Sequence, residues 1–171
     1  MKILAISGSL RHSSSNTQLL QALALLAPAG TNITLFTELA QFPHFNPDLD
    51  QEPAPHAVAA FRNQLGWADA VVISTPEYAH GVPGSLKNAL DWIVSSGEFV
   101  QKPVCLINAS QQAIHAYESL AETLKVMLAV LVPDGFVTVP VQGRKLTATE
   151  IAANPEFSVY LCRVISLLVD R

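Results

Sequence analysis

Polar side chains that can bind an anion gather directly after the first apolar run of this chain. The run is Ile3–Ile6, and the polar segment that follows it is Gly8–Asn16. That segment holds one cation, Arg11, and a group of hydroxyl and amide side chains, namely Ser9, Ser13, Ser14, Ser15 and Asn16. Where such a segment leads from a strand into a helix, free backbone N–H groups add further donors. This donor set suits a phosphate monoester that is held without reacting.

Three better-known phosphate loops do not match this segment. It has no lysine and no second glycine in register for the GxxxxGK[ST] loop of nucleotide triphosphatases, and it lacks the GxGxxG dinucleotide fingerprint. A phosphatase loop needs a cysteine nucleophile ahead of the arginine, and none lies between Ser7 and Arg11. A second interpretation stays open here: Ser15 or Asn16 caps the following helix, and the other serines are solvated turn residues.

A second segment offers a different kind of surface. Pro76–Gly84 follows the apolar run Ala70–Ile73 and contains Tyr78 between two prolines, Pro76 and Pro83. An aromatic side chain on a loop stiffened by prolines can form a flat floor for a ring. Together the two segments predict a site for a phosphorylated, planar cofactor.

Apolar runs and stretches with helical spacing alternate along the chain, and they predict the elements that position these two segments. Short apolar runs predict five strands, at residues 2–7, 32–36, 70–75, 103–108 and 135–139. Stretches with helical spacing predict five helices, at residues 16–27, 56–67, 85–96, 116–131 and 155–169. Near-continuous apolar strands that alternate with helices indicate an open parallel α/β sheet with both faces covered. We expect one domain over residues 1–171, with a long loop at 38–55.

Ligands bind such sheets beyond the carboxyl ends of the strands, where the strand order reverses. The loops after the first, third and fourth predicted strands are residues 8–16, 76–84 and 109–115. We therefore expect these three loops to lie side by side and to form one site.

The composition narrows the classes of function. Half of the 171 residues are hydrophobic, 14% are charged, and the formal net charge is −4. No basic stripe is available to neutralise phosphates, so we expect no nucleic-acid partner. No apolar run has the length of a membrane span, so we expect no membrane insertion. Met1 and Lys2 lead straight into the first predicted strand, which favours a cytoplasmic protein without a signal peptide.

The cysteines and one tryptophan are expected to have structural roles, and the histidines do not indicate a metal site. Cys105 and Cys162 lie in apolar segments without CxxC spacing, and we expect both to be small buried residues. The five histidines show no ligand spacing, so no metal site is predicted. Trp67 ends a predicted helix and is expected in the core.

Two motifs make the chain similar to a known family. The first is Gly8-Ser9-Leu10-Arg11, followed by Ser14 and Asn16; the second is Pro76-Glu77-Tyr78, together with Pro83-Gly84-Ser85-Leu86-Lys87-Asn88-Ala89-Leu90-Asp91-Trp92. These residues resemble the NADPH-dependent FMN reductase family, and the second motif is the more specific. The resemblance implies a flavodoxin-like three-layer fold, in which a five-stranded parallel sheet of order 2-1-3-4-5 has helices on both faces.

The resemblance also implies which residues bind FMN. Around the phosphate it implies Ser9, Arg11, Ser14, Ser15, Asn16 and Thr17. Along the isoalloxazine ring it implies Pro76, Glu77, Tyr78, Ala79, His80 and Gly81, with Ser110 from the loop after the fourth strand. It implies no catalytic side chain, because the flavin itself carries the hydride chemistry.

By the same resemblance we expect an FMN-dependent oxidoreductase that works by a ping-pong cycle. Hydride would pass from NADPH or NADH to bound FMN and then to a small acceptor such as a quinone, free flavin, chromate or an azo compound. The resemblance further implies a homodimer or a homotetramer.

The chain departs from the family pattern in two places. Ala79 and His80 stand where the family usually has asparagine after Glu-Tyr, and His80 is either a substrate contact or an ordinary exposed histidine. The family's loop after the fourth strand is rich in glycine, whereas residues 108–116 contain none. We expect larger side chains to crowd or reshape that wall, with weaker FMN binding or an altered pocket. Two alternatives therefore stay open: an FMN-binding electron carrier without NAD(P)H activity, and an interaction protein that has lost the flavin.

Overall fold

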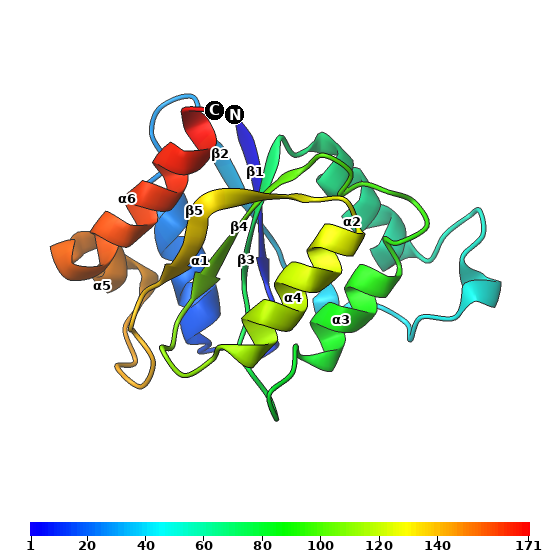
Figure 1. Ribbon diagram of the computed structural model, residues 1–171, viewed down its shortest axis with the longest axis horizontal. Coiled ribbons are helices and arrows are strands. Elements are labelled where there is room, and N and C mark those ends of the chain that lie inside the picture. The colour runs from blue at the N-terminus through cyan, green and yellow to red at the C-terminus, as the bar shows by residue number, and fades with distance from the viewer.

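A computed structural model describes residues 1–171 and shows a parallel five-stranded sheet of order β2-β1-β3-β4-β5 (Figure 1). The strands are β1 (Lys2–Ser7), β2 (Asn32–Phe36), β3 (Ala70–Ser74), β4 (Pro103–Asn108) and β5 (Val130–Thr138). The helices are α1 (Ser15–Leu25), α2 (His56–Trp67), α3 (Gly84–Asp91), α4 (His115–Val126), α5 (Ala148–Ala153) and α6 (Pro155–Val169). The predicted fold class and strand order are confirmed.

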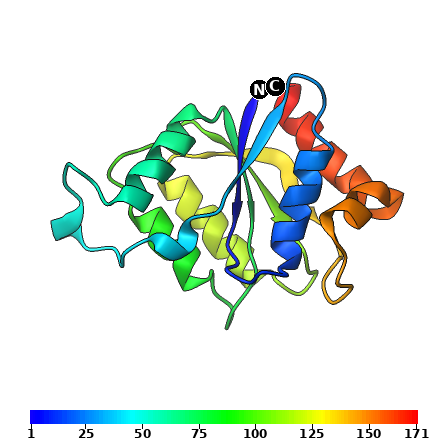
Figure 2. The same ribbon diagram turned by 180° about the vertical axis from the view of Figure 1, so that it is seen from behind.

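Helices cover both faces of the sheet and bury two separate cores. Helices α1, α5 and α6 lie on one face and α2, α3 and α4 on the other, as Figures 1 and 2 show from opposite sides. Successive residues of the central strands alternate between the cores: Ile3 and Ala5 join the first, whereas Leu4 and Ile6 join the second. A strand buried on both faces needs apolar side chains in both directions. Burial on both faces therefore explains the unbroken apolar runs in the sequence.

The fifth strand begins five residues before its predicted start. The strand runs over Val130–Thr138, but its middle contains Pro133, Asp134 and Gly135, which in sequence indicate a turn. The pairing register between β4 and β5 shifts at this place, and Asp134 has a positive φ of 57°. At Gly135 an added Cβ would lie 2.7 Å from the sulfur of Cys105. The irregular strand thus approaches β4 closely where a side chain has no room.

Three predicted helices end earlier in the structure than expected, and one short helix was missed. Helix α1 ends at Leu25 rather than at 27. Helix α4 ends at Val126 rather than at 131, because Leu128 adopts a left-handed conformation with φ of 61°. Helix α3 ends at Asp91 and gives way to turns before Gly97. The short helix α5 was not predicted, although Thr147 and Glu150 form a capping box at its start.

Two expectations of burial are wrong. Trp67 is 47% exposed, because it ends α2 at the surface, where the Lys2 ammonium lies 4.6 Å from its ring centroid. Cys162 is exposed on α6, since Leu161, Val164 and Ile165 are the neighbours that face the core. Cys105 is buried as expected, and burial raises the pKa of its thiol to about 12.

The segment between β2 and α2 projects from the body of the molecule (Figure 1). It is held by Asp50, whose carboxylate accepts hydrogen bonds from Arg62 at 2.7 Å and from the Ser95 hydroxyl at 2.5 Å. The Arg62 guanidinium also donates to the Trp92 carbonyl at 2.6 Å. Ser95 and Arg62 together hold the pKa of the Asp50 carboxyl below its usual value. We call residues 38–55 the projecting segment.

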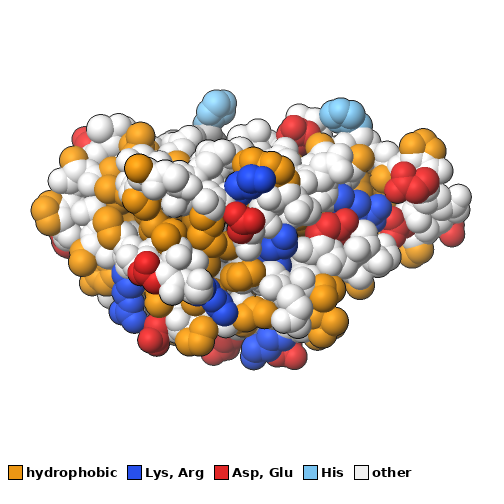
Figure 3. Space-filling model, turned by 90° about the horizontal axis from the view of Figure 1, so that it is seen from above, with side chains coloured by type: hydrophobic (Ala, Val, Ile, Leu, Met, Phe, Trp, Pro, Cys, Tyr) orange, Lys and Arg blue, Asp and Glu red, His pale blue; other side chains and the backbone are white.

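The surface shows mixed charges on the side toward which both termini point. In Figure 3 basic and acidic side chains are intermixed on this side, with hydrophobic areas between them. No helix combines the length and the apolar character that crossing a membrane requires.

Candidate functional site

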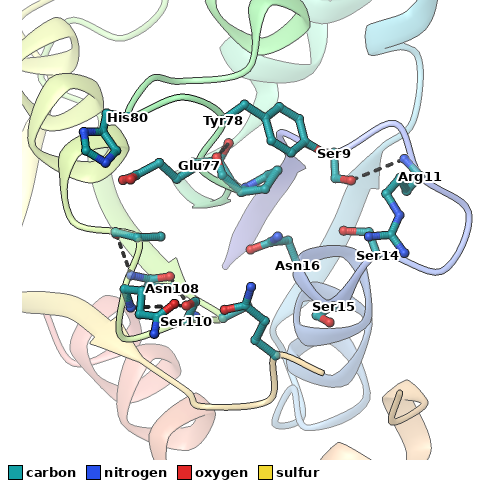
Figure 4. A pocket seen from close by; sticks show the side chains of 16 residues that line it. Ser9, Arg11, Ser14, Ser15, Asn16, Glu77, Tyr78, His80, Asn108 and Ser110 are labelled. Atoms are coloured by element: carbon teal, nitrogen blue, oxygen red, sulfur yellow. Dashed lines mark hydrogen bonds between the residues drawn. The ribbon is translucent and has the colours of Figure 1, made fainter. Parts of the chain in front are cut away.

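Three loops meet at the carboxyl edge of the sheet and enclose a cavity of about 410 Å³ (Figure 4). They follow β1, β3 and β4, which are the three loops expected to lie side by side. The cavity is lined by Ser9, Arg11, Ser14, Ser15, Asn16, Thr75, Pro76, Glu77, Tyr78, His80, Asn108, Ala109, Ser110, Gln112, Ala113 and Gln142. All the predicted site residues except Thr17, Ala79 and Gly81 are therefore brought together here.

The first loop presents the amino end of α1 to the cavity. Ser14 caps this helix, and its hydroxyl oxygen accepts a hydrogen bond from the Thr17 N–H at 3.5 Å. Ser15 and Asn16 begin the helix, so their N–H groups have no carbonyl within it to donate to. The Thr17 hydroxyl pairs instead with the Ser7 hydroxyl at 2.8 Å, which accounts for its absence from the lining. Ser14 thus caps the helix and still leaves N–H groups at its start free toward the cavity.

Arg11 gives this end of the cavity its positive charge. It is the one lysine or arginine in the lining, and it takes part in no ion pair. The side chain is exposed and lies in Figure 4 at the end of the cavity occupied by the first loop. A free guanidinium beside helix N–H groups attracts an anion, and phosphate geometry suits it well.

The first loop packs tightly against the end of β3. An added Cβ at Gly8 would lie 2.1 Å from the Thr75 hydroxyl oxygen, so only glycine fits there. Close by, the buried Ser74 hydroxyl donates to the Asn16 side-chain oxygen at 2.9 Å. These contacts set the distance between the first and second loops.

The second loop is a tight turn that carries Tyr78 and His80. Tyr78 and Gly81 exchange two backbone hydrogen bonds, at 3.1 and 2.9 Å, and form an isolated antiparallel bridge. Ala79 and His80 between them both have positive φ, 49° and 60°. Ala79 and Gly81 therefore shape the turn rather than line the cavity. The Tyr78 ring stays 54% exposed at the cavity mouth.

Glu77 fastens this turn to helix α4. Its carboxylate accepts a hydrogen bond from the Ala116 N–H at 2.8 Å, within the first turn of α4. The residue before that helix, Ile114, provides no side-chain cap. Glu77 therefore caps α4 from another loop, where a negative charge is favourable. Sequence spacing could not have shown this contact, which joins positions 39 residues apart.

Tyr117 supports the floor of the cavity from behind. Its ring is fully buried, and its hydroxyl oxygen accepts a hydrogen bond from the Thr75 N–H at 3.2 Å. The same hydroxyl donates to the carbonyl of Ile107 at the end of β4. Burial raises the pKa of Tyr117 far above its usual value, so this hydroxyl keeps its proton. One side chain thus joins the carboxyl ends of β3 and β4.

The glycine-free third loop is ordered by Asn108. This buried side chain accepts from the Ser110 N–H and donates to the Ala113 carbonyl, both at 2.9 Å. Gln112 and Ala113 form part of the wall, and the cavity stays open beside them. The expected effect of this wall on FMN binding stays a prediction. The segment after β5 closes the site, because the Gln142 N–H donates to the Ala109 carbonyl at 3.1 Å.

Sequence reasoning missed Thr75, Asn108, Ala109, Gln112, Ala113 and Gln142 as lining residues. Most of them lie at strand ends or in the third loop, where the rule for parallel sheets already pointed. Gln142 gave no such signal, because no cluster of polar or aromatic residues marks the segment after β5. No group of three or more His, Cys, Asp or Glu side chains is placed to hold a metal ion.

The sheet order defines a flavodoxin-like α/β protein, and its cavity lies at the switch in strand order. A family model described as NADPH-dependent FMN reductase matches residues 1–143, and the chain belongs to this family.

Several known proteins resemble this chain. An NAD(P)H-dependent FMN reductase of Pseudomonas aeruginosa is 41% identical over 112 residues, which are 64% of this chain and 60% of that protein. A quinone reductase of Escherichia coli K12 is 36% identical over 117 residues, which are 67% of this chain and 62% of that protein. The matched part thus spans about three fifths of these curated relatives.

Solved structures extend the likeness to the whole chain. The flavoenzyme NAD(P)H:(acceptor) oxidoreductase FerB of Paracoccus denitrificans superposes with a TM-score of 0.75 at 26% identity, covering 99% of this chain and 95% of that one. Flavodoxin 1 of Bacillus cereus, at 13% identity, has a TM-score of 0.62 with 100% and 99% coverage, and this likeness shows the fold alone.

Proposed function

We propose that this protein is an FMN-dependent NAD(P)H oxidoreductase with a ping-pong cycle. Hydride passes from NADPH or NADH to bound FMN, and then to a small acceptor such as a quinone, free flavin, chromate or an azo compound. Family membership and the activities of the similar proteins described above support this function. The observation that carries it is the single cavity in which an anion-binding end faces a loop bearing an exposed aromatic ring.

The residues present fit FMN. At one end, Arg11, Ser9 and the amino end of α1 offer a cation, a hydroxyl and N–H groups, the donors that a phosphate needs. A side chain at Gly8 would collide with Thr75, so glycine at this position lets the first loop lie close to the end of β3. A volume of about 410 Å³ lies within the range of small-molecule sites.

The remaining predicted residues have separate tasks in this proposal. The phosphate end is formed by Ser14, Ser15 and Asn16, with Thr17 behind them, paired with Ser7. The ring end is formed by Pro76, Glu77, Tyr78, His80 and Ser110, while Ala79 and Gly81 shape the turn that carries them. When bound, FMN supplies the redox chemistry by accepting hydride at its ring and passing two electrons on. The chain orients the ring between the turn at Tyr78 and the wall at Ser110, and it supplies no nucleophile.

The proposal extends to the form of the whole protein. We propose that residues 1–171 make one FMN-binding domain, that the protein acts in the cytoplasm, and that it assembles as a homodimer or homotetramer. The exposed side chains of Phe45 and Leu49 on the projecting segment support assembly, because they leave apolar surface uncovered in the single chain.

An anaerobic absorption titration tests the activity. The protein is titrated with FMN, and NADPH or NADH is then added to the stoichiometric complex. We expect a perturbed flavin spectrum on binding and rapid bleaching with at least one of the two nucleotides. Bound flavin that stays oxidised with both nucleotides would identify an electron carrier, and no binding of FMN would overturn the proposal.

A further inference from the structure

Two histidines are stacked at the end of the cavity that lies away from Arg11. The imidazole rings of His80 and His115 have centroids 4.2 Å apart and planes inclined by 28°. His80 lines the cavity, whereas His115 lies at the start of α4 and is outside the lining. Figure 4 shows His80 and Arg11 at opposite ends of the site.

The position of His80 is fixed from three directions. Its backbone is the second positive-φ residue of the turn closed by the Tyr78–Gly81 bridge. Its ring rests on His115. The hydrogen bond from the Ala116 N–H to the Glu77 carboxylate connects this turn to α4. An exposed loop side chain thus has a defined place beside the cavity.

In the second half of the proposed cycle, the acceptor needs a proton in addition to the hydride. Reduction of a quinone to a hydroquinone adds one hydride and one proton. The hydride brings two electrons from the reduced cofactor and forms one new bond to the acceptor. The proton must come from another donor and form the O–H bond on the quinone oxygen that becomes negative.

The lining contains few groups able to provide this proton. Besides His80 its titratable side chains are Arg11, Glu77 and Tyr78. Arg11 lies at the opposite end of the cavity, and the Glu77 carboxylate already accepts the hydrogen bond from the Ala116 N–H. Histidine is the side chain suited to proton transfer near neutral pH.

We propose that His80 is the proton donor to a quinone acceptor and that His115 is its positioning residue. In this step an N–H bond of the protonated His80 imidazole breaks, and an O–H bond forms on the acceptor. Neutral His80 then takes a proton from solvent, to which its exposed side chain has access. The inference rests on the proposed function and adds to it a residue that protonates the acceptor.

The test compares two acceptors in the FMN-loaded protein. A benzoquinone needs a proton with its hydride, whereas ferricyanide takes one electron and no proton. We expect H80N to lower the ratio of benzoquinone to ferricyanide turnover about a hundredfold, the scale of a lost general acid. Asparagine suits the positive φ of position 80, so the turn is kept. H115A is expected to lower the ratio several-fold by freeing the His80 ring.

His56 provides the matched control, because it is exposed at the start of α2 and outside the cavity lining. H56N is expected to leave the ratio at its wild-type value. An unchanged ratio in H80N, with NAD(P)H still bleaching the flavin, would overturn the role of His80 alone. Failure of NAD(P)H to bleach the flavin in the wild-type protein would instead overturn the proposed function.

A binding measurement gives a readout independent of turnover. Imidazole NMR signals of the FMN-loaded protein are recorded during titration with 4-hydroxycoumarin, a planar probe that does not accept hydride. We expect the His80 signal, identified by its loss in H80N, to shift with the His115 signal while that of His56 stays in place. A probe that binds without moving the His80 signal would contradict contact between His80 and the acceptor.

Discussion

At the scale of single residues, the positive charge of the site is supplied by one side chain. The chain as a whole is acidic, with a formal charge of −4, yet the cavity contains the unpaired cation Arg11. All other arginines except the C-terminal Arg171 are paired in the structure, with Asp50, Glu156 or Asp134. An unpaired guanidinium beside helix N–H groups is available to a ligand rather than to the fold.

Replacing Arg11 with alanine is expected to weaken FMN binding without destabilising the apoprotein. Loss of charge-assisted hydrogen bonds, worth about 1.5–3 kcal/mol, corresponds to a rise in Kd of about 10- to 100-fold. Fluorescence titration of FMN measures this change. Arg144→Ala is the control, because Arg144 pairs with Glu156 outside the cavity. Equal FMN affinity of Arg11→Ala and the wild type would remove Arg11 from the site.

Residue types and their places after strands pointed to the first loop and to Tyr78, and the family resemblance added Glu77, His80 and Ser110. The hydroxyl groups of the first loop and the ring of Tyr78 are visible in sequence because they interrupt apolar runs. Trp67 and Cys162 show the limit of this reasoning. Their types favour burial, but their orientation depends on which side of a helix faces the sheet, and both lie outside.

At the scale of elements, the site depends on links between strand ends rather than on any one loop. Tyr117 of α4 is the clearest of these links, since its hydroxyl joins Thr75 after β3 to Ile107 on β4. Its ring also stacks on Phe136 of β5, with centroids 5.0 Å apart. Three neighbouring strands are therefore held by one side chain directly beneath the cavity.

Removing the Tyr117 hydroxyl is expected to destabilise the fold. In Tyr117→Phe the buried Thr75 N–H loses its acceptor, which costs about 1–3 kcal/mol in free energy of unfolding. Urea unfolding followed by circular dichroism measures this change. The control is Tyr160→Phe on α6, whose side chain is exposed and in which we expect no more than a few tenths of a kcal/mol. Equal losses in the two variants would argue against the link.

Elements with a regular pattern were predicted from sequence with the observed bounds, among them β1, β2, β4, α2 and α6. The start of β5 was not, because Pro133 and Gly135 look like a turn while the strand continues through a shifted register. Helix α5 is too short to show periodicity. Links such as Glu77 to Ala116 depend on the fold as a whole and have no sequence pattern.

At the scale of the whole molecule, the projecting segment is held to the body at both of its ends. Near its start, Leu39 is buried in the second core, and the Pro43 carbonyl accepts hydrogen bonds from the side chains of Asn88 and Trp92. Phe45 meets the edge of Trp92, with ring centroids 5.1 Å apart, and the Phe45 N–H donates to Asn88 at 2.8 Å. The ion pair of Asp50 with Arg62 is the charged contact, with side-chain exposures of 13% and 15%. Such a pair keeps most of its strength because little solvent screens it.

The ion pair of Asp50 with Arg62 should make the free energy of unfolding depend on pH. The pKa of Asp50 is lower in the folded chain than its usual value of about 4, so its contribution is present above that pH. This contribution is lost as the pH falls through the lowered value. Asp50→Asn is expected to lose about 1–3 kcal/mol at pH 7, and its difference from wild type should shrink below pH of about 4.

Thermal unfolding between pH 7 and pH 3 measures this dependence. Asp134→Asn is the control, because Asp134 is 78% exposed and lies 3.8 Å from Arg163, so its loss should be small at every pH. A loss in Asp50→Asn that stays constant down to pH 3 would show that the carboxylate charge does not contribute.

The two cysteines have opposite reactivity, with a practical consequence for work on this protein. Reaction with a thiol reagent needs access and a thiolate, and Cys105, buried against Gly135 with a pKa of about 12, offers neither. Cys162 is exposed on the outer side of α6. The natural chain therefore carries a single attachment point for a dye or a spin label, remote from the cavity lining, and no substitution is needed to create it.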